Sequence, residues 1–175
     1  LFLGMMSCSE DNLKGYSSSN YIQFDKLSKD STVFSFAYDE TLESGTVALK
    51  LVMISPLVDR DRKYNVKFLQ DESSAQAGED FEMPAEEQVI AANDSVAYLN
   101  VTVTRNEALK GSVLAVFEVQ GSDDFMPGIE ANRKGRIFIT NQLTRPGWWN
   151  DWHEANGLGT YSDLKYQTFI REIGV

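Results

Sequence analysis

Few side chains in this sequence could carry out chemistry in a fixed arrangement. Cys8 is the only cysteine and His153 the only histidine among 175 residues. A hydrolytic triad or a zinc centre needs histidines, cysteines and carboxylates that converge on one point, and the sequence contains neither a nucleophile elbow nor a phosphate-binding loop. Two carboxylates would suffice for a glycoside hydrolase, but 26 acidic residues select no pair. We therefore expect no catalytic residues and no enzyme, with a carboxylate-based hydrolase as the alternative.

Cys8 is better explained as an attachment point for lipid. It follows the apolar run 1–6 and the small residue Ser7, and it precedes a polar stretch rich in Ser, Asn and Gly. This order is typical of a bacterial lipobox, in which the signal is cleaved before the cysteine and the thiol is acylated, so that each buried methylene contributes about 0.8 kcal/mol to membrane binding. We expect residues 1–7 to be a signal-peptide remnant and 8–20 a lipidated flexible tether. An ordinary unpaired thiol is the alternative.

All three tryptophans of the chain, Trp148, Trp149 and Trp152, fall within five positions beside Asp151 and His153. An indole offers a large apolar area with one polar N–H, so these residues are candidate ligand-binding residues that could hold sugar rings or a partner protein. The alternative, which the sequence alone favours, is that they pack a C-terminal helix onto one end of the domain. In a strand the adjacent Trp148 and Trp149 would point to opposite faces, leaving at most one of them free.

Composition limits the partners of the chain. Its net charge is −10 and its pI is near 4.5, which argues against nucleic acid because a phosphate-binding surface needs clustered Lys and Arg. With one cysteine no disulfide can form inside the chain, and after residue 7 no apolar run approaches the about 20 residues of a membrane-spanning helix. A hydrophobic content of 42% is enough for the core of one ordinary domain.

Apolar and polar residues alternate along much of the chain between residues 21 and 140. Strands are expected at 21–24, 33–38, 45–54, 64–68, 88–90, 96–104, 113–119 and 136–140, with turns between them, including 25–30. Seven or eight short strands without a helical period predict a mainly β protein, a two-sheet antiparallel sandwich of the immunoglobulin type, with a barrel as the alternative. We place this sandwich at 21–141.

The remaining segment, 142–175, has a different composition. Ser162 is a suitable N-cap, and Leu164, Phe169 and Ile173 follow near helical spacing. We expect a Trp-rich C-terminal appendage with one short helix.

The central part of the sequence resembles Calx-beta sandwich modules. The matching residues are the turn 76–81, the strand and turn 89–93 and the strand 96–103. Such modules often bind calcium with acidic loops, and the resemblance implies the candidate metal ligands Glu79, Asp80, Asp123 and Asp124. Their spacing matches no fixed pattern such as an EF-hand loop, and solubility is the alternative role of acidic loops.

Over nearly its whole length the chain resembles a family of uncharacterised Bacteroidetes surface lipoproteins. The similar features are Cys8 and the segments 21–24, 35–38, 61–62, 78–81, 145–149 and 158–166. Ser9–Asn12 also resembles the signal that moves such lipoproteins to the outer face of the outer membrane, and family members are commonly encoded beside SusC-like and SusD-like uptake proteins. The resemblance implies a lipid-anchored protein facing the cell exterior, with an accessory or glycan-binding role in nutrient uptake. A structural or adhesion-like module with calcium-binding loops is the alternative.

Overall fold

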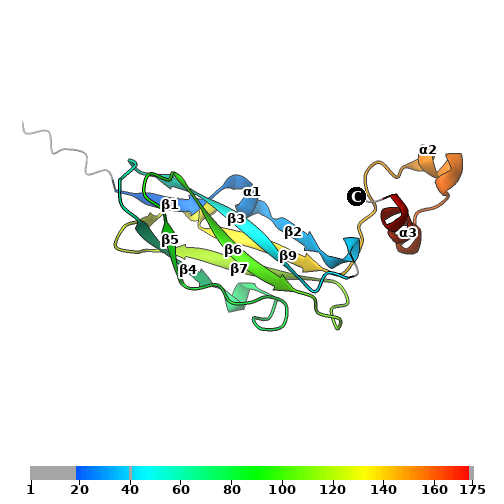
Figure 1. Cartoon of the computed structure of the whole chain (residues 1–175), viewed down its shortest axis with the longest axis horizontal. Coiled ribbons are helices and arrows are strands. Elements are labelled where there is room, and N and C mark those ends of the chain that lie inside the picture. Colours follow the sequence, from blue (N-terminus) through cyan, green and yellow to red (C-terminus); the bar gives the residue numbers. More distant parts are fainter. Residues whose placement is uncertain (1–18, 40, 174–175) are drawn as a thin grey trace, which may run out of the picture.

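The computed structural model describes residues 19–39 and 41–173, which form a two-sheet β-sandwich followed by a small helical lobe (Figure 1). One sheet has the strand order β6-β3-β1-β8 and the other β2-β9-β7-β4-β5. The strands are β1 (Tyr21–Phe24), β2 (Thr32–Ser35), β3 (Ser44–Ile54), β4 (Arg62–Phe68), β5 (Glu87–Ile90), β6 (Val96–Thr104), β7 (Ser112–Gln120), β8 (Met126–Pro127) and β9 (Lys134–Thr140). The mainly β sandwich predicted from the sequence is confirmed.

Alternation of apolar residues builds the core between the two sheets. β3 pairs with β6 in antiparallel register, with Leu49 opposite Leu99, and the inward side chains of both strands are buried. β7 lies inside the second sheet and buries Ala115, Val116 and Phe117 in succession, as expected for a strand covered on both faces. The resulting contacts join the two sheets along their length.

The first strands depart from the predicted pattern. Residues 33–38 were expected to form one strand, but β2 ends at Ser35, whose hydroxyl accepts a hydrogen bond from the amide of Ala37 and starts a 3-10 turn, Phe36–Tyr38. The predicted turn 25–30 instead contains helix α1 (Lys26–Asp30), which is capped by the side chain of Asp25. α1 carries the chain from one sheet to the other, so that β2 pairs in parallel with β9.

The two ends of the sandwich are distinct. Near the start of β1, the side-chain amide of Asn20 donates to the carbonyl oxygen of Asp124. At the other end, β9 finishes beside the start of β7, and the amide of Asn141 donates to the carbonyl oxygen of Asn106. The chain continues from there into the lobe, which contains α2 (Asp151–His153), a π-type turn (Glu154–Leu158) and α3 (Asp163–Ile173). The lobe and the start of β1 therefore lie at opposite ends of the molecule (Figure 1).

Candidate functional site

Trp149 forms the centre of the helical lobe. Its side chain is only 2% exposed and packs against Tyr166 and Ile170 of α3. The indole N–H donates to the carbonyl oxygen of Gly159 at 3.3 Å, so the polar end of the ring is also satisfied. Burial in this small core raises the pKa of Tyr161, whose ring lies 5.4 Å from that of Trp149, to about 12. Trp149 thus holds the lobe together.

Trp148 and Trp152 lie at the surface of the same lobe, with exposed fractions of 41% and 67%. Trp148 and Trp149 stack with their ring centroids 5.6 Å apart and do not point to opposite faces, because they lie in a turn in which the amide of Trp149 bonds the carbonyl oxygen of Pro146. Trp152 lies on α2, whose first amides are capped by Asn150 Oδ1. The imidazole of His153 lies between the two exposed indoles, 5.8 Å from Trp148 and 5.0 Å from Trp152.

A shallow cavity of about 470 Å³ lies beside Trp152. It is lined by Trp152, Trp149, Pro146, Gly147, Arg145, Asn150 and Asp151. The guanidinium of Arg145 donates through Nε to the carbonyl oxygen of Trp149 at 2.7 Å, while its Nη2 lies 3.2 Å from Glu154 and 4.0 Å from Asp151. The cavity thus places a guanidinium, an amide and a carboxylate around an exposed indole. Such a combination suits a ligand with both an apolar face and polar edges.

Sequence reasoning did not select Arg145 and Asn150 as site residues. The available signal was their position within a few residues of the tryptophans, but only the turn at Pro146 and the cap of α2 bring their side chains to the same cavity. The sequence places Asp151 beside the indoles without indicating a role for its carboxylate.

A second groove, of about 460 Å³, runs along α3. Its lining is mainly apolar, with Leu158, Leu164, Phe169 and Ile173. Lys165, Thr168 and Glu172 also line it, but most of its surface is apolar, so it is less suited to a polar ligand than the cavity beside Trp152.

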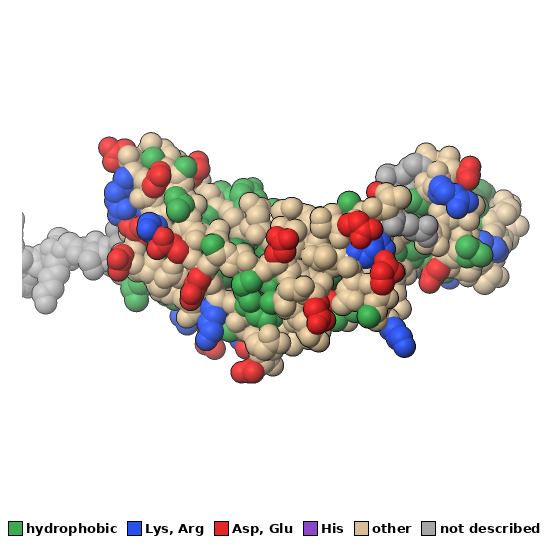
Figure 2. Space-filling view, turned by 60° about the horizontal axis from the view of Figure 1, so that its bottom comes forward, with side chains coloured by type: hydrophobic (Ala, Val, Ile, Leu, Met, Phe, Trp, Pro, Cys, Tyr) green, Lys and Arg blue, Asp and Glu red, His purple; other side chains and the backbone are tan. Residues whose placement is uncertain are grey.

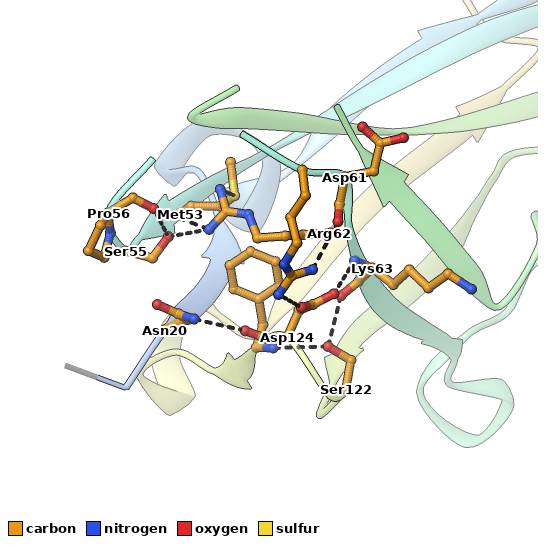
Figure 3. A network of polar contacts seen from close by, with 11 residues as sticks. Asn20, Met53, Ser55, Pro56, Asp61, Arg62, Lys63, Ser122 and Asp124 are labelled. Carbon is orange, nitrogen blue, oxygen red and sulfur yellow. Dashed lines mark hydrogen bonds and ion pairs between the residues drawn. The ribbon is translucent and has the colours of Figure 1, made fainter. Parts of the chain in front are cut away.

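At the opposite end of the sandwich, Asp124 organises a network of polar contacts (Figure 3). Its carboxylate accepts hydrogen bonds from Arg60 Nη2 at 2.5 Å and from the amide of Lys63 at 2.8 Å. The hydrogen bond from Arg60, followed by that from the Lys63 amide, lowers the pKa of Asp124 below its ordinary value. The buried side chain of Arg62 lies beside this network and donates to Ser55 and Pro56.

The four candidate calcium ligands do not form one site. Asp80 lies beside Thr104 at the end of β6, whereas Asp123 and Asp124 follow β7 at the other end of the sandwich. Both carboxylate oxygens of Asp80 are used within the protein, by the amide of Gln76 and the side chain of Asn106, and Glu79 lies exposed beside it. Among the residues that the structure describes, no group of three His, Cys, Asp or Glu is arranged to hold a metal ion. The four residues are therefore divided between the two ends of the sandwich and do not share one calcium centre.

Two other expectations concern the membrane. Cys8, the predicted lipidation site, lies outside the described residues. In the part of the chain that is described, no helix has the length and apolar character needed to cross a membrane.

Comparison with solved structures identifies the class of fold. The apo form of the Calx CBD1 domain aligns with a TM-score of 0.53 and 9% identity over 71% of this chain and 99% of that domain. A CBD12 structure from CALX1.2 has a TM-score of 0.51 and 9% identity over 69% and 44% of the respective chains. A protein from Bacteroides ovatus described as a "putative carbohydrate binding protein" has a TM-score of 0.52 and 12% identity over 70% and 37%. The chain therefore has a Calx-beta-like sandwich, and it spans less than half of the latter two proteins.

Residues 15–175 match the model of a protein family, the domain of unknown function DUF4843. The chain belongs to this family, and the match includes both the sandwich and the Trp-rich lobe. No protein with a curated description matches the sequence.

Proposed function

We propose that this protein is a non-catalytic glycan-binding lipoprotein of the outer-membrane surface, and that the indole of Trp152 is the platform on which a sugar ring stacks. The observation that carries the proposal is the exposure of two thirds of this large apolar side chain beside a cavity ringed by Arg145, Asn150 and Asp151. The Trp149 core fixes the surrounding segment, so the platform is held in place before a ligand arrives.

The chemistry of a sugar matches this surface. A pyranose ring has an apolar face of C–H groups and a rim of hydroxyls that both donate and accept hydrogen bonds. The face of the indole can pack against the C–H face of the sugar by dispersion and burial of apolar area. The guanidinium, the side-chain amide and the carboxylate at the rim of the cavity can form hydrogen bonds with the sugar hydroxyls.

The placement of the lobe supports a role at the cell surface. A lipid on Cys8 would attach the chain on the N-terminal side of β1, and the lobe lies at the far end of the sandwich from β1 (Figure 1). The sandwich then acts as a spacer that presents Trp152 away from the membrane. Neighbouring SusC-like and SusD-like uptake proteins are the proposed recipients of the bound glycan, and the fold is one that the Bacteroides ovatus protein also has.

Binding is tested by calorimetric titration of the full chain carrying Cys8→Ser, which prevents acylation, with dextran, laminarin, yeast mannan, galactan and xylan. We expect saturable binding of at least one polysaccharide and a loss of at least tenfold in affinity for Trp152→Ala, with an unchanged melting temperature. The matched control is Tyr98→Ala, which removes an exposed aromatic ring from β6, away from the lobe. If no polysaccharide binds, or if Trp152→Ala and Tyr98→Ala bind alike, the proposed function is wrong.

The anchor is tested separately in cells. Metabolic labelling with a fatty acid analogue should mark the wild-type protein and not Cys8→Ala, and protease added to intact cells should digest the wild-type protein. An unlabelled wild-type protein, or one protected until the cells are broken, would contradict the proposed attachment or its orientation.

A further inference from the structure

We infer that the cavity beside Trp152 selects uncharged glycans over anionic ones and that the carboxylate of Asp151 determines this selection. The inference rests on the proposed function, since it concerns the ligand class of the same site. It follows from the charges around the cavity and from how each polar group is already used.

Arg145 is the one cation among the residues lining the cavity, and its charge is already compensated. Its Nη2 lies 3.2 Å from Glu154 and 4.0 Å from Asp151, so two carboxylates share one guanidinium. Its Nε is used by the carbonyl oxygen of Trp149. An incoming carboxylate or sulfate would have to compete with both acidic side chains for the same guanidinium, which removes the usual advantage of arginine as an anion-binding residue.

Asp151 presents the opposite chemistry to the ligand. Its side chain is fully exposed at the rim, and an ionised carboxylate can only accept hydrogen bonds. Sugar hydroxyls can donate to it, whereas an anionic substituent cannot and is repelled. Asn150 complements it, because its Oδ1 caps α2 and leaves the NH₂ group of the amide as a donor. A neutral sugar can satisfy both residues at once.

The charge of the whole chain acts in the same direction. The net charge is −10, and acidic side chains are spread over both the sandwich and the lobe on the face shown in Figure 2. This field disfavours the approach of a polyanion, although salt screens it over about 10 Å at 0.1 M. High salt therefore separates the long-range field from the local effect of Asp151.

The test compares neutral and anionic polysaccharides on the full chain carrying Cys8→Ser. The neutral polysaccharide that binds tightest is titrated beside its own carboxymethylated derivative, with sulfated dextran and polygalacturonate as further anions, at 0.05 and 0.5 M NaCl. We expect the carboxymethylated form to bind at least tenfold more weakly than its parent at both salt concentrations. Asp151→Asn should reduce this ratio several-fold, and Asp151→Lys should bring the two affinities to within about threefold.

Asp59→Asn is the matched control, since it makes the same change in net charge on an exposed loop at the opposite end of the sandwich. It should leave the ratio at 0.5 M NaCl unchanged. The inference is overturned if the wild-type protein binds the anionic derivatives as tightly as the neutral parent, or if Asp151→Lys leaves the ratio as it was. In either case the proposed function stands, because a glycan has bound; absence of binding by every polysaccharide would instead overturn the proposed function and this inference with it.

Discussion

The guanidinium carbon of Arg62 lies 4.8 Å from the centroid of the Phe125 ring, and both side chains are buried. No carboxylate of the described residues forms an ion pair with this arginine at 4.0 Å or less. Its Nη atoms donate instead to Ser55 Oγ at 2.7 Å and to carbonyl oxygens of Pro56 and Asp94, both at 3.3 Å. One side chain thereby joins the segment after β3, the turn before β6 and the loop before β8.

Replacing this arginine should therefore destabilise the sandwich. Arg62→Ala leaves several acceptors without a donor, at about 1–3 kcal/mol for each buried one, and it opens a cavity over Phe125. We expect a loss of about 3 kcal/mol in the free energy of unfolding, measured by urea denaturation followed by far-UV circular dichroism. Arg62→Lys should recover only part of it, because one ammonium group cannot span the same acceptors. The control Arg171→Ala, at an exposed position of α3, should change stability by less than about 0.5 kcal/mol; an equally small effect at Arg62 would refute the assignment.

Asp124 should make the stability of the protein depend on acid pH. The hydrogen bonds from Arg60 and from the amide of Lys63 lower its pKa below the ordinary 3.8 in the folded state. A carboxyl group with a lowered pKa contributes stability that is present above pH 3.8 and is lost as the pH falls through the folded-state value. Asp124→Asn should therefore unfold at lower urea concentration than the wild type at pH 6, and the difference should shrink at pH 3. Asp59→Asn serves as the comparison, and a gap at Asp124 that stays constant with pH would be inconsistent with this linkage.

Gly135 should not tolerate a side chain. A Cβ at this position of β9 would lie 2.7 Å from the ring of Phe24, which is fully buried between the sheets. Gly135→Ala therefore forces the ring or the strand to move, at about 1–3 kcal/mol, and should lower the melting temperature by several degrees. Gly111→Ala is the matched control, because no atom lies within 4 Å of its Cβ position. Equal melting temperatures of the two variants would show that the core can yield around Phe24.

The helical lobe should fold only when the side chain of Trp149 is present. Truncating a buried tryptophan costs about 3–5 kcal/mol, which is a large fraction of what a core of this size can supply. Trp149→Ala should raise hydrogen–deuterium exchange in α3 to the level of an unfolded peptide while β3, β6 and β7 remain protected. Trp152→Ala should leave exchange in α3 as in the wild type, because its ring is mostly exposed. Protection of α3 in Trp149→Ala would mean that the lobe is held by other contacts.

Alternation in the sequence was sufficient to predict the long strands. Leu49 and Leu99 lie in segments where every second side chain is apolar, and such a pattern has one face to bury. The same pattern wrongly predicted that the strand continues through Phe36. A 3-10 turn ends the strand there and still buries the Phe36 ring. No alternation in the sequence indicates β8, because this strand is only two residues long and contains Pro127.

The sites were harder to predict than the strands. Arg62 stands in a run of alternating charges, and nothing local distinguishes it from the exposed Arg60; burial comes from Met53, Asp94 and Phe125, which the fold brings from three other segments. The spacing of the tryptophans indicated a cluster but not which ring is buried. The turn after Pro146 stacks the two adjacent indoles, and the contacts with Tyr166 and Ile170 of α3 bury Trp149.

The pairing of β2 with β9 also determines when the sandwich can be completed. Thr32 lies opposite Ile137 in this ladder, and β1 lies beside β8. The strands that emerge first from the ribosome thus find these partners only after most of the domain has been made, and contacts of such long sequence separation form slowly. Completion of this sandwich therefore depends on β9, the last strand of the described residues to be synthesised.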